Sequence, residues 1–408
     1  MNTKDTDYQF WRLKLIASIS FLLLFSVQLN ASKNHTTIII SLDGFRWDYS
    51  YIYNTPMLDF MADHGIESGL IPSFPSKTFP NHYTLATGLY PDHHGIVANS
   101  FYNPSTKTVF SIKKKEIKNN PLFYGGEPLW ITAKKQGLKT AVFYWPGSEV
   151  KIQGMYPDLY YNYEKKKLLS FEERISGIIQ QLRKSPEERP DLIMAYFEQP
   201  DANGHDYGPH DKRTQKAVIQ MDSLVRYLYN GIEFLGLSDE VNFIVLSDHG
   251  MTWADETHAL KLKYLLDESL IEEIQGSLPV NIYTKKGKAR KVFQKLKDMD
   301  HVKVWLREDI PSYLHYGENP CVGDIVIMPD QGYFIDDDDK PSSGGTHGYD
   351  PTLMDMHALF RAIGPDIPHS HIPHFPNVDV YPLICELLGI KPANNDGKIP
   401  FQIIKNDK

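Results

Sequence analysis

The sequence predicts an α/β fold in which helices cover both faces of a central β-sheet. Short runs rich in β-branched and aromatic residues alternate along the chain with stretches whose apolar residues recur at helical spacing. The chain has 408 residues, of which 41% are hydrophobic and 23% are charged, so it can bury a large core within one domain. This composition excludes disordered and fibrous classes.

Apolar runs mark the predicted strands, which span residues 36–42, 140–145, 191–197, 241–247 and 321–328. Between the first two runs, Pro56–His64 is predicted as a helix, because Thr55 suits its N-cap, a proline opens it and Gly65 follows its end. Residues 171–184 and 212–234 also have helical apolar spacing.

Residues 1–31 have the pattern of a signal peptide. Basic residues precede an apolar stretch at 15–27, and small or polar residues follow as far as Ala31. We expect a signal peptide over 1–31, with an uncleaved anchor as the alternative, and one domain over 32–408. The protein is therefore expected to be exported, to a periplasm or outside the cell. A membrane partner is expected only if this segment stays uncleaved.

The cysteine content and the net charge further narrow the class of protein. Only Cys321 and Cys385 are present, which argues against a disulfide scaffold and suits a bacterial periplasm. We expect two buried thiols, because Cys385 lies in an apolar helical run. The net charge of -8 gives no general attraction to nucleic acid, so no duplex binding is expected.

Three predicted strands are followed by carboxylates and loop-forming residues, at Asp43, Asp201 and Asp248. In open α/β sheets, ligands bind in the crevice beyond the carboxyl ends of the strands. These three side chains can therefore converge although they are far apart in the sequence.

Histidines accompany these carboxylates. His249 is adjacent to Asp248, His205 lies four residues after Asp201, and His347 lies between glycines. Imidazole and carboxylate are the ligands that catalytic zinc uses. One such pair alone is more often a simple hydrogen bond, but three acids with three histidines predict two metals with three protein ligands each.

A candidate nucleophile lies in the proline-rich run that ends in SKTFPNHY. Thr78 stands where this loop gives way to a helical stretch, so its hydroxyl is expected at a helix N-terminus, which favours anions. The alternative role for an isolated threonine at this position is that of an N-cap.

The chain resembles the nucleotide pyrophosphatase/phosphodiesterase family of the alkaline phosphatase superfamily. The stretches that carry the resemblance are LDGFRWDY, KTFPNHYTLATGLYPDHHGI, EQPDANGHDYGP, LSDHGM and GTHGYD. It implies an alkaline-phosphatase-like fold, with a central, mostly parallel β-sheet flanked by helices on both faces, and a phosphodiesterase catalytic domain over 32–408.

The resemblance also implies roles for single residues. One zinc ion is bound by Asp201, His205 and His347. The other is bound by Asp43, Asp248 and His249, together with Thr78 Oγ1. None of the other histidines near the motifs, such as His82 and His94, is assigned a metal.

Substrate contacts are implied in the same way. Asn99 would hold a phosphate oxygen beside the backbone N–H of Phe79, Phe79 and Tyr163 would sandwich a nucleobase, and Glu149 would lie near the base edge. Because the ring faces make this contact, we expect Tyr163→Phe to be nearly silent.

The implied function is two-zinc hydrolysis of nucleoside triphosphates, dinucleotides and nucleotide diesters to nucleoside 5'-monophosphates. It would pass through a covalent intermediate on Thr78. A lipid-headgroup phosphodiesterase of the lysophospholipid or glycerophosphocholine type is the alternative, because an aromatic slot also accepts a quaternary ammonium group. A metal- or carbohydrate-binding module without activity would leave Thr78 and Asn99 without roles.

Overall fold

A computed structural model describes residues 35–163, 168–337 and 343–400. The signal-peptide pattern at 1–31 lies outside these residues. The part of the chain from His35 onward groups into one compact unit. No helix in the described ranges has the length and apolar character needed to cross a membrane.

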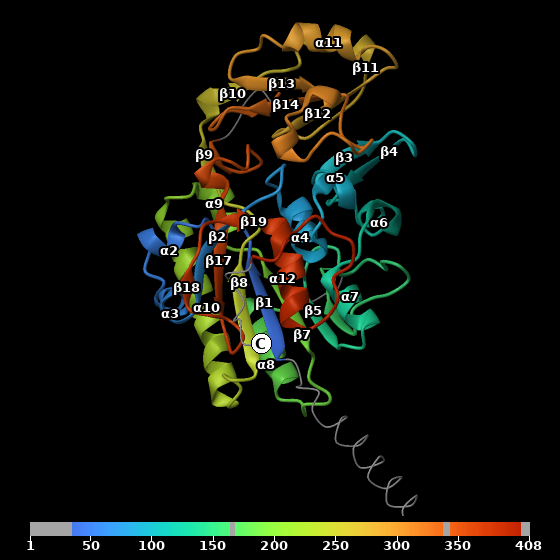
Figure 1. Cartoon of the computed structure of the whole chain (residues 1–408). Helices are drawn as coiled ribbons and strands as arrows, with labels where there is room; N and C mark the ends of the chain where they lie inside the picture. The colour runs from blue at the N-terminus through green and yellow to red at the C-terminus, as the bar shows by residue number, and fades with distance from the viewer. Residues whose placement is uncertain (1–34, 164–167, 338–342, 401–408) are drawn as a thin grey trace, which may run out of the picture. The chain divides into compact units, whose positions relative to one another are not determined.

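A mixed, mostly parallel sheet forms the centre of the fold (Figure 1). Its strands follow the order β18-β2-β17-β8-β1-β7-β5-β6, with β19 also paired to β2. The parallel part consists of β8 (Val241–Leu246), β1 (Thr36–Leu42), β7 (Leu192–Phe197), β5 (Thr140–Phe143) and β6 (Leu159–Tyr161). This arrangement confirms the predicted fold class, and four of the five predicted strands lie in this sheet.

On one side of the sheet a strand runs antiparallel to its neighbours, which the local sequence pattern does not predict. Strand β17 (Ala358–Ile363) runs antiparallel to both β8 and β2 (Ile66–Ile71). Two short segments, β18 (Ser370–His371) and β19 (Phe375–Pro376), then pair with β2 in parallel.

Helices cover both faces of this sheet (Figure 1). On one face, α3 (Pro56–His64), α8 (Phe171–Leu182) and α10 (Lys212–Phe234) pack together. On the other face, the packed helices are α4 (Thr78–Thr87), α7 (Leu129–Lys135) and α12 (Val380–Leu387). Because both faces are covered, every residue of β1, β7 and β8 is buried.

The start of α3 differs in detail from the expectation. Thr55 occupies the N-cap position but makes no side-chain capping bond. The carboxylate of Asp222, from α10, instead accepts hydrogen bonds from the backbone N–H groups of Met57 and Leu58, at 3.0 and 2.9 Å. A residue from a neighbouring helix thus satisfies the free N–H groups of the first turn.

The predicted strand at 321–328 belongs to a second sheet, not to the main one. This sheet is antiparallel and has the order β11-β12-β14-β13. Its elements are β11 (Ile271–Gln275), β12 (Val280–Thr284), β14 (Ile325–Pro329) and β13 (Val302–Leu306), with α11 (Ala289–Leu296) packed on it. A separate apolar cluster, which includes Ile282, Val292 and Ile325, forms its core. We call it the small sheet.

The small sheet is inserted through a two-stranded stem. β9 (Thr252–Ala254) leaves the main body just after His249, and β16 (Gly344–Thr346) returns antiparallel to it just before His347. The remaining short elements are α2 (Tyr49–Ile52), α5 (Pro91–His94), β3 (Ser100–Asn103), β4 (Thr108–Ser111), α6 (Lys115–Lys118), α9 (Asp201–Tyr207), β10 (Ala259–Leu260) and β15 (Phe334–Ile335). Both cysteines are buried free thiols, as predicted.

Candidate metal centre and nucleophile

The six predicted metal ligands gather into two groups of three. The groups are Asp201 with His205 and His347, and Asp43 with Asp248 and His249. Within each group the ligand atoms lie within 4.8 Å of one another. The strand order explains the convergence, because β1 lies between β7 and β8 and all three strands run parallel. Asp43 and Asp248 each follow a strand, and Asp201 begins α9 after β7.

Close backbone approach brings the two groups together. Gly44 has a positive φ of 65°, and a Cβ atom at this position would lie 2.8 Å from the Cβ of Asp201. The backbone N–H of Asp201 donates to the carbonyl of Asp43 at 2.9 Å. The rings of His249 and His347, one from each group, are stacked with centroids 3.6 Å apart. A larger residue than glycine at position 44 would therefore separate the ligands.

Each ligand histidine is oriented by a backbone carbonyl. Nδ1 lies 2.9 Å from the carbonyl of Gly250 in His249, 2.8 Å from that of Gly345 in His205, and 2.7 Å from that of Ser76 in His347. Because a carbonyl only accepts, Nδ1 must donate in all three rings. When the rings are neutral, Nε2 carries the lone pair, which is the tautomer that a metal-binding imidazole needs.

Unsatisfied carboxylate oxygens show that a cation fits both groups. Oδ1 of Asp43, Oδ1 of Asp201 and Oδ2 of Asp248 are buried and accept no hydrogen bond. Buried carboxylate oxygens without a donor are costly, and positive charge is the partner that relieves the cost. With the Nε2 lone pairs, they form a nitrogen and oxygen donor set suited to zinc or a similar divalent metal.

The pKa values reflect this crowding of like charges. Burial, and then the charge of Asp248, raise the pKa of Asp43 well above its usual value, against the hydrogen bond from Tyr196. Burial alone would also raise the pKa of Asp248, but the neighbouring imidazoles of His249 and His82 hold it well below its usual range. Of the two carboxylates, Asp248 thus holds its negative charge more readily than Asp43.

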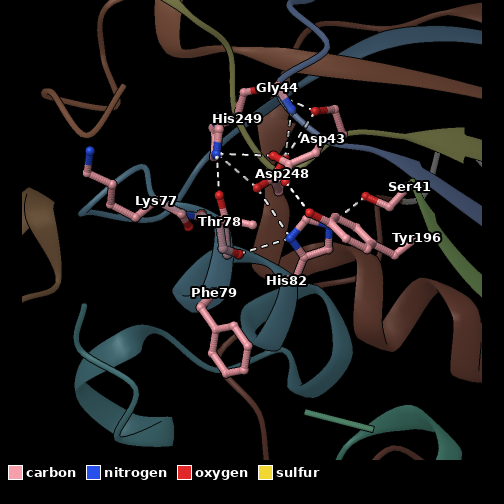
Figure 2. A network of polar contacts seen from close by, with 12 residues as sticks. Ser41, Asp43, Gly44, Lys77, Thr78, Phe79, His82, Tyr196, Asp248 and His249 are labelled. Carbon is pink, nitrogen blue, oxygen red and sulfur yellow. Dashed lines mark hydrogen bonds and ion pairs between the residues drawn. The ribbon is translucent and has the colours of Figure 1, made fainter. Parts of the chain in front are cut away.

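Thr78 lies at the predicted place, as the first residue of α4. Its Oγ1 is 3.2 Å from Nε2 of His249, and Figure 2 shows the hydroxyl pointing toward that ring while the side chain of Phe79 points away. The hydroxyl makes no capping bond to its own helix, since Lys77 is the N-cap residue. Thr78 is therefore beside a ligand group instead of serving as a cap.

The loop before Thr78 is held by Asn81, one turn into the same helix. Oδ1 of Asn81 accepts from the backbone N–H of Ser73 at 2.8 Å. Its Nδ2 donates to the carbonyls of Pro75 and Lys77, both at 2.9 Å. These bonds fix the backbone on the N-terminal side of Thr78 and so restrict the position of its hydroxyl.

Asn99 lies close to the nucleophile, with one change from the expected arrangement. Its Oδ1 accepts the backbone N–H of Phe79 at 3.0 Å. That N–H is thus engaged by Asn99 itself, which differs from the expected arrangement, in which both groups face one phosphate oxygen.

The small sheet supports the segment that carries Asn99. The hydroxyl of Tyr316 donates to the carbonyl of Val97 at 3.1 Å. On the other side of Asn99, the hydroxyl of Tyr283 in β12 accepts the backbone N–H of Tyr102 at 3.1 Å. Asn99 is thus bracketed by two tyrosines from the inserted segment.

The residues expected to contact a base have separate surroundings. Phe79 is buried and contacts the rings of Phe110 and Tyr124. Tyr163 is 37% exposed, and its nearest ring neighbours are Tyr144 and Tyr196.

Glu149 is engaged in an ion pair. Its Oε1 lies 2.5 Å from the Nζ of Lys118, and both side chains are largely buried. A contact of Glu149 with a substrate would therefore compete with this ion pair.

Two residues around the ligands were not predicted. Nδ1 of His82 lies 2.9 Å from the Thr78 carbonyl and 3.3 Å from Oδ2 of Asp248. The hydroxyl of Tyr196 donates to Oδ2 of Asp43 at 2.6 Å. The four-residue spacing between Thr78 and His82 could have indicated the first contact, whereas a tyrosine inside a buried strand is typical of a core residue.

Fold and site together define an alkaline-phosphatase-like α/β protein with two candidate metal groups beside a threonine hydroxyl. A family model, Type I phosphodiesterase / nucleotide pyrophosphatase, matches residues 37–350. The chain belongs to this family.

Similar proteins support the assignment. Ectonucleotide pyrophosphatase/phosphodiesterase family member 1 of Homo sapiens is 37% identical over 379 residues, covering 88% of this chain and 40% of the relative. Venom phosphodiesterase CdcPDE of Crotalus durissus collilineatus is 36% identical, covering 88% of this chain and 45% of the relative. The chain thus spans less than half the length of these curated relatives, which by their names are hydrolases.

A solved structure is also similar. Murine ectonucleotide pyrophosphatase/phosphodiesterase 5, an inactive variant in complex with AMP, superposes with a TM-score of 0.85 at 32% identity. The match covers 91% of this chain and all of that chain. It confirms the fold class.

Proposed function

We propose that this protein hydrolyses nucleotide phosphodiesters and phosphoanhydrides, using Thr78 as nucleophile and two zinc ions. The observation that carries the proposal is the Thr78 hydroxyl, which lies at a helix N-terminus 3.2 Å from Nε2 of His249. That ring stacks on His347 of the second ligand group. Nucleotide substrates are favoured because a similar solved protein binds AMP.

The residues of this chain have distinct parts in the reaction. Asp201, His205 and His347 would hold one zinc ion, and Asp43, Asp248 and His249 the other. Bound zinc lowers the pKa of an attacking hydroxyl and neutralises charge on phosphate oxygens. The protein positions the nucleophile through α4, and Nδ2 of Asn99 donates to a phosphate oxygen as charge develops.

The bonds change in two displacements. Thr78 Oγ1 forms a bond to phosphorus while the bond to the leaving oxygen breaks, and the leaving group takes up a proton. Water then breaks the threonine–phosphorus bond, releases the nucleoside 5'-monophosphate and restores the hydroxyl. Two in-line steps give retention of configuration at phosphorus. We also propose that the protein works outside the cytoplasm, on the basis of the N-terminal pattern.

The test compares Thr78→Ala with Thr87→Ala, a matched threonine that ends the same helix. Thr78→Ala should lower turnover of ATP and of a chromogenic thymidine monophosphate ester by orders of magnitude, while zinc content stays near wild type. Thr87→Ala should keep its activity. Retained turnover in Thr78→Ala, or inversion at phosphorus, would refute the nucleophile.

The substrate class is tested on the wild-type protein. ATP, the thymidine ester, a simple chromogenic monoester and glycerophosphocholine are compared at matched concentrations. We expect the nucleotides to be hydrolysed fastest. Strong activity on glycerophosphocholine with little on ATP would move the assignment to a lipid-headgroup phosphodiesterase.

A further inference from the structure

Tyr163 is anchored through its hydroxyl, not only through its ring. The hydroxyl donates to Oε1 of Glu198 at 2.6 Å. Glu198 follows β7 directly and precedes the ligand Asp201 by three residues. The aromatic ring that faces solvent is therefore tied to the same strand end that carries a metal ligand.

Glu198 is itself held in a fixed orientation by Arg174 of α8. The two guanidinium nitrogens, Nη1 and Nη2, donate to Oε2 and Oε1 at 2.8 and 2.9 Å. Nη1 also donates to the carbonyl of Tyr196 at 2.8 Å, and the guanidinium carbon lies 4.0 Å from the ring centroid of Tyr144. Such a two-pronged, charge-assisted pair is short and directional. Since the side chain of Arg174 is only 2% exposed, it provides a rigid base.

We propose that Glu198 and Arg174 are positioning residues that fix Tyr163 as one wall of the nucleoside slot. The inference rests on the proposed function, and on the role that the family resemblance implies for Tyr163, which is to stack on the base. It revises the expectation that Tyr163→Phe is nearly silent, because the hydroxyl orders the ring although only the ring face contacts the substrate.

The physical reason is pre-organisation. An exposed aromatic ring that samples several rotamers must be ordered when a base stacks on it, and this ordering lowers affinity. A ring held by a charge-assisted hydrogen bond is ordered before the substrate arrives. Loss of the hydroxyl should therefore act on substrates that carry a base, and mainly through KM.

The chain contains a matched control for this arrangement. The hydroxyl of Tyr51 donates to Oε1 of Glu67 at 2.6 Å, and Arg361 Nη2 donates to the same oxygen at 2.9 Å. Glu67 lies on β2, which no predicted site residue occupies. Tyr51→Phe thus deletes the same kind of hydroxyl from the same kind of triad without touching the ligand groups.

The experiment measures kcat and KM for a thymidine 5'-(4-nitrophenyl phosphate) ester and for methyl 4-nitrophenyl phosphate, which lacks a base. Tyr163→Phe should lower kcat/KM on the thymidine ester about three- to tenfold, the ratio expected for one hydrogen bond of typical net strength. The loss on the base-free diester should be smaller. Tyr51→Phe should match wild type on both substrates.

A double-mutant cycle with Glu198→Gln tests whether the two residues act together. If the two residues act as one unit, the double variant should lose little more kcat/KM on the thymidine ester than the single variant with the larger loss. Zinc content, measured for each variant, should remain near wild type. Additive losses, equal losses on both substrates, or a Tyr163→Phe variant indistinguishable from Tyr51→Phe would overturn the inference. Failure of the proposed function is a different outcome, since wild type would then not hydrolyse the thymidine ester.

Discussion

His82 should control metal affinity although it is not placed as a ligand. Its side chain is fully buried, and Nε2 lies 2.8 Å from Oγ of Ser41. Since the Thr78 carbonyl only accepts, Nδ1 of His82 must donate to it at 2.9 Å, and the same nitrogen lies 3.3 Å from Oδ2 of Asp248. One imidazole thus contacts both a candidate metal ligand and the backbone of Thr78 (Figure 2).

The perturbation is His82→Phe, which keeps a planar ring and removes both nitrogens. Buried polar groups that lose their partner cost about 1–3 kcal/mol each, so the free energy of unfolding should fall by about 2–4 kcal/mol. Loss of a partner that orients a metal ligand typically lowers metal affinity or activity about 10–100-fold. We expect a loss of this size at the group formed by Asp43, Asp248 and His249.

The assay is competition between the protein and a chelator of known zinc affinity, with urea unfolding measured in parallel. The matched control is His94→Phe, because His94 is equally buried and contacts Thr84 Oγ1 and the Ile96 N–H, each at 3.1 Å, but no ligand. The control should lose stability and keep zinc affinity. If both variants bind zinc equally tightly, the reasoning is refuted.

Three further predictions concern the metal and the fold. Chelation should abolish activity and zinc should restore it; full activity of protein shown to be metal-free by elemental analysis would contradict the proposal. Asp222→Ala should lower the free energy of unfolding by about 1–2 kcal/mol in urea, since α3 loses its cap, whereas Asp63→Ala, at an exposed position of the same helix, should have little effect. Burial raises the pKa of Asp92 from 3.8 to about 6, so its protonated form stabilises the fold below about pH 4 and this contribution is lost as the pH rises through 6. Relative to Asp92→Asn, the wild type should therefore lose up to ~3 kcal/mol of unfolding free energy between pH 4 and pH 7. A difference in unfolding free energy between the two proteins that is the same at both pH values would refute the assignment.

The sequence predicted which acids and histidines come together better than it predicted the edges of the fold. Asp43, Asp201 and Asp248 could be found because the carboxyl ends of parallel strands lie at one edge of the sheet. An acidic residue in the loop after a buried apolar strand is also easy to recognise in the sequence. Strands such as β2 and β17 are antiparallel and carry charged residues, Glu67 and Arg361, that satisfy each other. Their pairing depends on partners distant in sequence, which local patterns do not contain.

The supporting contacts were harder to predict for the same reason. Glu198 and Arg174 lie on different elements and meet only when β7 packs beside α8. The candidate metal ligands are all acids or histidines, and several of them follow a strand. Glu198 and Arg174 share neither a residue type nor a position of this kind. Local patterns therefore reveal the groups that do chemistry more readily than the groups that hold them.

The two-stranded stem has a consequence for how such a protein can diversify. Because β9 and β16 are paired neighbours, the small sheet between them forms a cassette that joins the main body through this stem. Exchange of this cassette between relatives would leave both ligand groups in the host, yet it would carry along Tyr283 and Tyr316, which bracket the segment of Asn99. Recombination at this joint would thus keep the candidate metal ligands of the host and change the side chains that support the segment of Asn99.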